Sequence, residues 1–386
     1  MATELNVAFQ GDAEAVSRIK EFLEDMRLIV RHEYNYDIIG TDLLRSTYCY
    51  LLVMGKTPGI SNHKLANILN RNIGLCKENI KSTFTGSITV WESLPYCGEV
   101  GIEFPRHGLP VRGFNELTDF AGTEGSILPL YVGEGLMGQS QVLDLGKMSH
   151  LFVIAQDYYA LGQFICPLFV HLSKLQHVQT FQYALLDGVG SPWCGTSLPK
   201  NIEWGGMQLS ECVVGAGDAQ KSKWLEKATD MLEFAEHELN KRREILGELD
   251  FSQYTREHGN QAPHLVIFVV GAPTYSVGIA VAHRKFRDQI MRLLEANTER
   301  YGVHLVIADC EIDRDINEFV QECMLGQGGR DVRIGMFLQN TGDIMTSAED
   351  VGLPEAGFVC RREMAIYRTP YNDIHRIRMA KECLEF

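Results

Sequence analysis

The stretch VLDLGKMSHLFVI at residues 142–154 and the stretch AQDYYALG at 155–162 together decide how this chain is interpreted. The first ends in an apolar run of strand length, and a second apolar run, FICPLFV at 164–170, follows with helical character. A phosphate-binding loop that joins such a strand to such a helix carries glycines, then a Lys, then a Ser or Thr. Residues 155–162 contain no Lys, Ser or Thr, so the frame of a nucleotide site is present without its phosphate-binding groups.

Placing Ala155 at the first glycine of such a loop puts Leu161 at the lysine position and Gly162 at the hydroxyl position. In a working loop the glycines turn backbone N–H groups toward the phosphates, the Lys reaches the outer phosphates, and the hydroxyl ligates Mg²⁺. Tyr158 and Tyr159 fall where small residues are needed, and their rings would fill the space of a phosphate. A simpler interpretation, a buried strand followed by a turn and a core helix, stays open for this segment alone.

Several further segments occur in an order that is typical of one protein family. They are GTDLLRS at 40–46, PGIS at 58–61, KLANIL at 64–69, GIEFP at 101–105 and LDLGKMSHLFV at 143–153. In this order the chain resembles the FtsK/SpoIIIE family of double-stranded DNA translocases, over roughly residues 37–362. The first segment lacks a Pro and a Tyr of the family pattern, whereas GIEFP matches closely. The resemblance implies a RecA-like P-loop NTPase-type core preceded by a small α+β domain.

The segment that resembles the family's acidic strand is altered at its end. The family has an apolar strand that ends in Asp and Glu, and here HLVIFVVG at 264–271 ends in Val270 and Gly271. In a motor the Asp orders Mg²⁺ and the Glu polarises the attacking water. Valine and glycine can do neither, so the resemblance implies that both groups have been lost.

The segment that resembles the next family strand is altered in the same way. GVHLVIADCEI at 302–312 keeps the apolar strand, while the family's Thr-Gln-Arg sensor is replaced by Asp309, Cys310 and Glu311. A cation near the phosphates has thus become an anion. Because several motor motifs are lost inside a retained hydrophobic frame, the resemblance implies a degenerate nucleotide site on a preserved fold.

Apolar periodicity predicts an α/β protein with a mostly parallel sheet and helices on both of its faces. We expect an N-terminal helix within 1–32, a small α+β domain at 33–120, a RecA-like motor-type domain at 127–360 and a helical C-terminal tail at 361–386. The Gly-rich segment at 121–126 reads as the linker. In the larger domain the predicted strands are 150–155, 181–187, 263–270, 303–308 and 332–338, and the predicted helices are 161–176, 219–246, 281–300 and 312–325.

Composition sets limits on where the chain works and on what it binds. Its 386 residues are 45% hydrophobic, but they include no run of about 18 apolar residues, so no membrane span is expected. The N-terminus lacks the basic and apolar regions of a secretory signal. No two of the ten cysteines form a C-x-x-C pair, which is evidence against zinc sites and indicates buried thiols in a reducing compartment. A cytoplasmic protein without a bound metal is expected.

The net charge of −14 opposes non-specific binding of DNA by the whole surface, because such binding depends on cations that displace counterions from phosphates. A ring can nevertheless carry a basic inner channel on acidic subunits. The candidates for such a channel are Arg284, Lys285 and Arg287, within HRKFR at 283–287. An ordinary solvated helix face is the competing interpretation.

Three functions are compatible with these observations. The first is a catalytically inactive FtsK-like subunit that serves as a scaffold or as a DNA-associated component of a ring, formed with itself or with an active FtsK-like paralogue. It would have no catalytic residue and no cofactor. The second is an active ATP-driven double-stranded DNA translocase with atypical motifs, which would need ATP and Mg²⁺. The third is a protein-binding module of a secretion or conjugation machine. The missing Lys and hydroxyl favour the first over the second, and little separates the first from the third.

Overall fold

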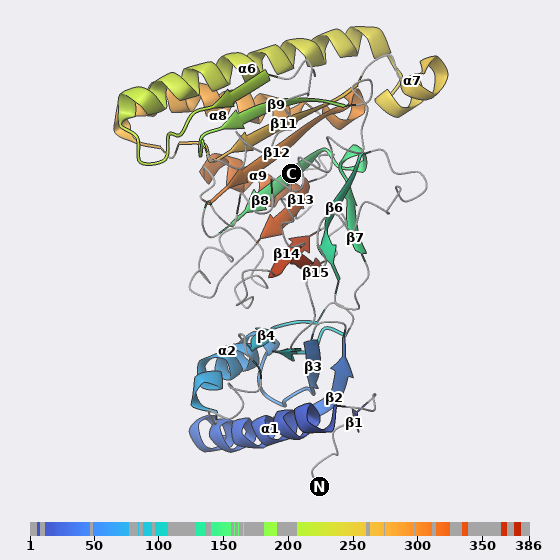
Figure 1. Ribbon diagram of the computed structural model, residues 1–386, viewed down its shortest axis with the longest axis vertical. Helices are drawn as coiled ribbons and strands as arrows, with labels where there is room; N and C mark the ends of the chain where they lie inside the picture. The colour runs from blue at the N-terminus through green and yellow to red at the C-terminus, as the bar shows by residue number, and fades with distance from the viewer. Residues whose placement is uncertain are drawn as a thin grey trace.

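The computed structural model describes residues 6–7, 12–46, 49–76, 84, 88–94, 97–106, 128–135, 140–155, 158, 161, 165, 181–190, 207–259, 263–273, 275–296, 298–310, 314–324, 334–338, 364–368 and 374–379. These residues form a five-stranded sheet and a ten-stranded sheet. Figure 1 shows the smaller sheet beside the N-terminal helix and the larger sheet with the long helix α6 along its outer side. None of the helices in these ranges is long and apolar enough to cross a membrane.

The smaller sheet has the strand order β1-β2-β3-β5-β4 and is antiparallel except for its edge pair β1 and β2. Its strands are β1 (Asn6–Val7), β2 (Gly40–Arg45), β3 (Cys49–Met54), β4 (Thr89–Trp91) and β5 (Gly101–Pro105). The helices are α1 (Ala13–Tyr34), α2 (Asn62–Asn72) and the 3₁₀ turn η1 (Ile73–Leu75). Helix α2 begins after Ser61, whose hydroxyl oxygen accepts the N–H of Lys64. The expected N-terminal helix and α+β sheet are therefore present.

Strand β3 is buried along its whole length and joins two cores. Tyr50, Leu52 and Met54 belong to the core cluster formed with α1 and α2. Cys49, Leu51 and Val53 point to the opposite face, because successive side chains of a strand alternate. They belong to the cluster that includes one face of the larger sheet. The small sheet is thus covered on both faces, which explains why β3 is an uninterrupted apolar run.

The larger sheet has the order β10-β9-β11-β12-β8-β13-β14-β15-β6-β7, in which neighbours from β10 to β13 are parallel and those from β13 onward are antiparallel. The parallel strands are β8 (His150–Ile154), β9 (Phe181–Asp187), β10 (Met207–Ser210), β11 (His264–Val270), β12 (Val303–Asp309) and β13 (Ile334–Leu338). The remaining strands are β6 (Pro129–Glu134), β7 (Ser140–Asp144), β14 (Met364–Arg368) and β15 (Ile374–Met379).

Helices cover one face of this sheet and are joined to it by a shared apolar core (Figure 1). They are α6 (Asp218–Leu246), α8 (Ala280–Glu295) and α9 (Arg314–Met324), with α7 (Phe251–His258) after α6 and the 3₁₀ turns η3 (Leu145–Lys147), η4 (Val277–Ile279) and η5 (Thr298–Tyr301). The opposite face packs against residues of β6 and β7 and against Leu161 and Ile165, both of which have helical backbone. The expected α/β class with a mostly parallel central sheet is confirmed.

The structure also differs from the expectations at identifiable places. The predicted helical tail at 361–386 is wrong where the structure describes it, because β14 and β15 form an antiparallel pair that extends the large sheet beyond residue 360. On β14 the buried Ala365 and Tyr367 belong to one core cluster and the buried Ile366 to the other, which is the two-residue period of a strand. Strands β6, β7 and β10 are additions to the prediction. The linker at 121–126 and most of the helix expected at 161–176 lie outside the described residues.

The amino ends of the central strands carry a buried polar cluster of three histidines. His264 Nδ1 lies 3.2 Å from His304 Nε2, and His304 Nδ1 lies 3.0 Å from the Met148 carbonyl oxygen. Since a carbonyl only accepts, His304 Nδ1 donates to Met148, and His264 Nδ1 donates to His304. The backbone N–H of Leu305 donates to His150 Nδ1 over 3.3 Å. Each ring is therefore held in one neutral tautomer.

Burial keeps these rings uncharged. It lowers the pKa of His150 to about 3, with the nearby His304 acting in the same direction. Burial also lowers the pKa of His304 to about 4, although the carbonyl groups of Met148 and Ser149 oppose it. The pKa of His264 is lowered well below its usual value by burial, by His304 and by the positive charge of Arg242.

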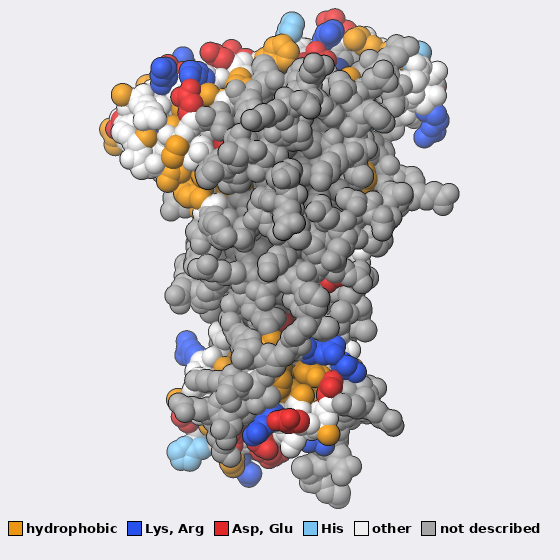
Figure 2. All heavy atoms as spheres, in the orientation of Figure 1, with side chains coloured by type: hydrophobic (Ala, Val, Ile, Leu, Met, Phe, Trp, Pro, Cys, Tyr) orange, Lys and Arg blue, Asp and Glu red, His pale blue; other side chains and the backbone are white. Residues whose placement is uncertain are grey.

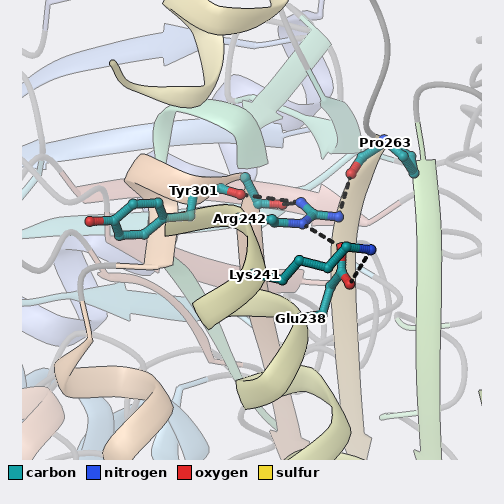
Figure 3. A network of polar contacts seen from close by, with 6 residues as sticks. Glu238, Lys241, Arg242, Pro263 and Tyr301 are labelled. Carbon is teal, nitrogen blue, oxygen red and sulfur yellow. Dashed lines mark hydrogen bonds and ion pairs between the residues drawn. The ribbon is translucent and has the colours of Figure 1, made fainter. Parts of the chain in front are cut away.

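Arg242 of α6 closes the same end of the sheet, with a side chain that is 3% exposed. Its Nη1 donates to the carbonyl oxygens of Tyr301 and Gly302, at 3.2 and 3.1 Å, and its Nη2 donates to the Pro263 carbonyl oxygen at 2.8 Å (Figure 3). Its Nε donates to Glu238 Oε1 at 3.2 Å. These bonds tie α6 to the residues that precede β11 and β12.

The histidine cluster predicts acid-sensitive stability. The unfolded chain binds protons below about pH 6.5, whereas the folded rings stay neutral until about pH 4 or lower. Stability from these groups is thus present above pH 6.5 and is lost as pH falls toward the folded pKa values. Each histidine contributes up to about 1.4 kcal/mol per pH unit in that range. Urea unfolding between pH 7.5 and about pH 4.5 measures this dependence.

The matched variants are His264→Asn, which keeps a donor near the Nδ1 position, and His32→Gln on the exposed face of α1. We expect His264→Asn to reduce the pH dependence of the free energy of unfolding by the contribution of one histidine. We expect His32→Gln to leave this pH dependence unchanged. An unchanged slope in His264→Asn would show that this cluster is not the source of the acid sensitivity.

Arg242→Met is expected to destabilise the fold by about 3–5 kcal/mol, because three backbone carbonyls lose a buried donor and Glu238 loses the closer of its two cationic partners. Arg242→Lys should rescue little, since one ammonium group cannot reproduce the guanidinium fork. Lys241→Ala is the control, because Lys241 is exposed and its ion pair with Glu238 spans 3.7 Å. Equal melting temperatures for Arg242→Met and Lys241→Ala would contradict the assignment.

Candidate functional site

The sequence-predicted site residues converge at the carboxyl edge of the central parallel strands. Ala155 follows β8, Val270 and Gly271 end β11, and Asp309 and Cys310 end β12. The order β11-β12-β8 makes these strand ends neighbours, and two backbone bonds hold them together. The N–H of Ala155 donates to the Asp309 carbonyl oxygen at 3.2 Å, and the N–H of Gly271 donates to that of Ala308 at 2.9 Å. This is the edge at which ligands of open parallel sheets bind.

The residues after β8 pack as core rather than as a phosphate loop. Ala155 and Leu161 are buried in the apolar cluster that also contains Val270. Leu161 stands at the position expected for the phosphate-binding Lys, and its side chain is fully buried. Tyr158 is half-buried and packs against the same cluster. Its ring edge is 3.3 Å from the point where a Cβ on Gly271 would lie, so it reaches the end of β11.

The end of β11 is closed by close backbone contact with the end of β9. A Cβ on Gly188 would lie 2.1 Å from the Gly271 carbonyl oxygen, and a Cβ on Gly271 would lie 2.4 Å from Val189 Cγ2. Gly271 also has a φ of 62°, which favours glycine. Neither position can carry a side chain without moving its neighbours. A carboxylate at residue 271 would therefore have to displace the Val189 side chain and adopt a positive φ.

Asp187 at the end of β9 is fully buried and stabilises the turn that makes this contact. Its Oδ1 accepts the N–H of Val189 at 3.0 Å and that of Gly190 at 3.1 Å. Its carbonyl oxygen accepts the indole N–H of Trp224 at 3.3 Å. The role of Gly188 and Gly190 in this turn was not predicted from the sequence. The pattern Asp-Gly-Val-Gly is the signal that could have indicated a tight turn.

Asp309 is buried, and its carboxylate folds back onto its own chain, where Oδ1 accepts the N–H of Cys310 at 2.7 Å. Cys310 is half-buried. Among the described residues no group of His, Cys, Asp and Glu is arranged to hold a metal ion. Tyr159, Gly162 and Glu311, which belong to the predicted site, lie outside the described residues. The described part of this edge is thus apolar or anionic, which suits packing and disfavours the binding of phosphate.

The predicted DNA-contacting residues are not equivalent on α8. Arg284 and Lys285 are exposed. Arg287 is half-buried, and it forms ion pairs with Asp288 Oδ1 at 3.0 Å and with Asp315 Oδ2 of α9 at 2.5 Å. Arg287 therefore connects two helices, and two of the three predicted cations are displayed on the surface.

Comparisons with known proteins give a partial sequence match and several matches in fold. No protein-family model matches the sequence. The curated DNA translocase FtsK of Treponema pallidum (strain Nichols) is 24% identical over 173 residues, which are 44% of this chain and 20% of that protein. The pCW3 conjugation coupling protein TcpA, solved as a monomer with ATPγS, aligns with a TM-score of 0.52 and 12% identity over 95% of both chains.

The cytoplasmic domain of the type VII secretion ATPase EccC from Thermomonospora curvata aligns with a TM-score of 0.51 and 14% identity, over 71% of this chain and 29% of that one. At such identities the solved structures establish the fold alone. The chain spans about a fifth of the FtsK relative and under a third of the EccC chain. The strand order and the two structural matches establish a RecA-like core, and the partial sequence match shows a similarity to FtsK over 173 residues.

Proposed function

We propose that this chain is an FtsK-like subunit that does not hydrolyse ATP and that serves as a structural component of an assembly. The observation that carries the proposal is the closed carboxyl edge of the sheet. Tyr158 and Leu161 pack into the core at positions where a motor would have its phosphate-binding loop. Gly188 lies in close contact with Gly271, at the strand end where a motor would have the carboxylates that hold Mg²⁺. Phosphoryl transfer depends almost entirely on positioned charges. The described residues of this edge supply no cation and no acidic pair at the end of β11.

Assembly is the second part of the proposal. We infer that the chain associates with itself or with an active FtsK-like paralogue through its RecA-like domain. Because the polar groups of a nucleotide site are missing, this association should not depend on ATP or Mg²⁺. An ATP-driven translocase with atypical motifs is the alternative that the nucleotide experiments below would reveal.

Association with duplex DNA is a weaker part of the proposal. Arg284 and Lys285 are exposed on α8, and phosphate contacts from them would be insensitive to sequence and strongly reduced by salt. The overall charge of −14 opposes such contacts. A salt series on a duplex of arbitrary sequence tests this, and absence of binding at low salt would remove DNA from the proposal.

We expect no ATP hydrolysis and no nucleotide-dependent stabilisation. A ligand at about 100 times its Kd stabilises a native protein by about 2.7 kcal/mol, which a thermal melt detects easily. The melting temperature with ATPγS and Mg²⁺ should equal that with Mg²⁺ alone. An intact FtsK-type motor serves as the positive control. DNA-stimulated turnover near ~1 s⁻¹, the low end for ordinary enzymes, would refute the proposal and support the translocase.

The close contact between Gly188 and Gly271 also predicts a loss of stability when a side chain is added at either position. Gly188→Ala and Gly271→Ala should each destabilise the protein by more than about 2 kcal/mol, because a methyl group must displace backbone or strain a positive φ. Gly74→Ala is the matched control, since nothing lies within 4 Å of its Cβ position. Urea unfolding measures the three variants. If Gly188→Ala and Gly74→Ala are equally stable, the strand ends are open and the argument for a closed site fails.

A further inference from the structure

An exposed apolar surface lies where α8 begins. Tyr275, Val277 and Val281 are 62%, 88% and 74% exposed, which is unusual for large apolar side chains in one short segment. Figure 2 shows hydrophobic side chains on the flank of the upper part, near the ends of α6 and α8 that adjoin the carboxyl edge of the sheet. Adjacent exposed apolar groups on a protein surface mark interaction sites.

The segment is held rigidly in this exposed position. Ile279 is buried and anchors η4 in the core. The Ser276 hydroxyl donates to Asp218 Oδ1 at the start of α6 at 3.1 Å, and a Cβ on Gly278 would collide with the Asp218 carboxylate. The Tyr275 ring packs edge-on against the buried His283. The apolar side chains are therefore presented by a fixed backbone, which lowers the entropy lost when a partner binds.

Two cations continue this surface along α8. Arg284 and Lys285 follow Val281 by three and four residues, so they share its side of the helix. Neither forms an ion pair with any part of the chain that the structure describes. We call Tyr275, Val277, Val281, Arg284 and Lys285 the α8 patch.

The outer side of α6 carries the complementary groups. Glu226, Asp230 and Glu233 are exposed and, within the described residues, form no ion pair. Phe234 is 53% exposed beside them. At about 100° per residue, these four positions cover about 100° of the helix circumference. We call them the α6 stripe.

The two surfaces match in the order of their side chains. Along the sequence the α8 patch runs from apolar to basic, whereas the α6 stripe runs from acidic to apolar. An antiparallel arrangement therefore brings Val277 toward Phe234 and the two cations of α8 toward Glu226, with Val281 beside Asp230. A parallel arrangement would bring the cations toward Phe234 and Val277 toward Glu226.

We propose that the α8 patch of one copy of this chain docks antiparallel on the α6 stripe of a second copy. The inference rests on the self-association proposed above and specifies its surface. The patch and the stripe lie on α6 and α8, which pack against each other in one copy, so a two-fold dimer can place each copy's patch on the other copy's stripe. Local charge complementarity also offsets the repulsion between two chains of charge −14.

Duplex DNA is a poorer occupant of the α8 patch. Three exposed apolar side chains flank the two cations, and phosphates gain nothing from contact with valine. Arg287, the third cation of the segment, is already paired with Asp288 and Asp315.

Sedimentation velocity over a concentration series tests the contact. V277S/V281D blocks the α8 patch, and an Asp in the first turn of α8 is favourable for the helix. E226K/D230K blocks the α6 stripe. Leu28→Gln removes an equally exposed apolar side chain from α1 and is the control. We expect the first two variants to weaken association about tenfold or more and the control to match the wild type. Thermal melts confirm that each variant is folded.

Mixing experiments distinguish this contact from others. A mixture of V277S/V281D with E226K/D230K keeps one intact patch and one intact stripe, so it should associate more strongly than either variant alone. R284E/K285E should fail to associate alone and should associate with E226K/D230K, because the charges are exchanged.

Association of V277S/V281D equal to that of the wild type would overturn the proposed surface while leaving self-association intact. A wild type that stays monomeric would overturn both, whereas ATP hydrolysis would count only against the inactive-subunit proposal. Loss of duplex binding by R284E/K285E without any change in association would assign the α8 patch to DNA and overturn the inference.

Discussion

The complete burial of β11 is the constraint on which the rest of the large domain depends. All seven of its residues are buried, and it pairs in parallel with β9 on one side and β12 on the other. Its side chains alternate between the two cores that hold the helices and the opposite layer. A strand with a neighbour on each edge and a core on each face cannot shift its register, because a shift of one residue would move every side chain to the opposite face. The groups at its two ends are therefore fixed in place relative to their neighbours.

Those two ends have different chemistry. At the carboxyl end, Gly188 and Gly271 bring backbones together and leave no room for a side chain. At the amino end, His264, His304 and Arg242 form a buried polar cluster in which the donors have defined acceptors. In a nucleotide-hydrolysing protein of this fold, the polar groups would be expected at the carboxyl end. The chain thus keeps a closely packed and hydrogen-bonded domain, while the described part of its carboxyl edge combines apolar side chains with the buried Asp187 and Asp309.

Sequence patterns predicted the parts of the fold that depend on local periodicity. The apolar runs at β8, β11 and β12 reflect strands that are buried along their whole length, so the positions of these strands could be predicted from the sequence. The strands β14 and β15 could not, because basic residues interrupt their short alternation and resemble a polar helix. The candidate site residues were predicted from motif order, and the structure brings the described ones to one edge of the sheet. The contact of Tyr158 with the end of β11 depends on strand neighbours far apart in sequence, which a linear pattern does not contain.

Arg242 gives α6 a further property. Its guanidinium group joins the C-terminal part of α6 to the residues that precede β11 and β12. It does so through the carbonyl groups of Pro263, Tyr301 and Gly302 (Figure 3). A force applied along α6 is consequently transmitted into the sheet through directional bonds as well as through apolar contacts, which resist shear weakly. Because Trp224 near the start of α6 also donates to the Asp187 carbonyl oxygen, hydrogen bonds join both ends of the helix to the sheet.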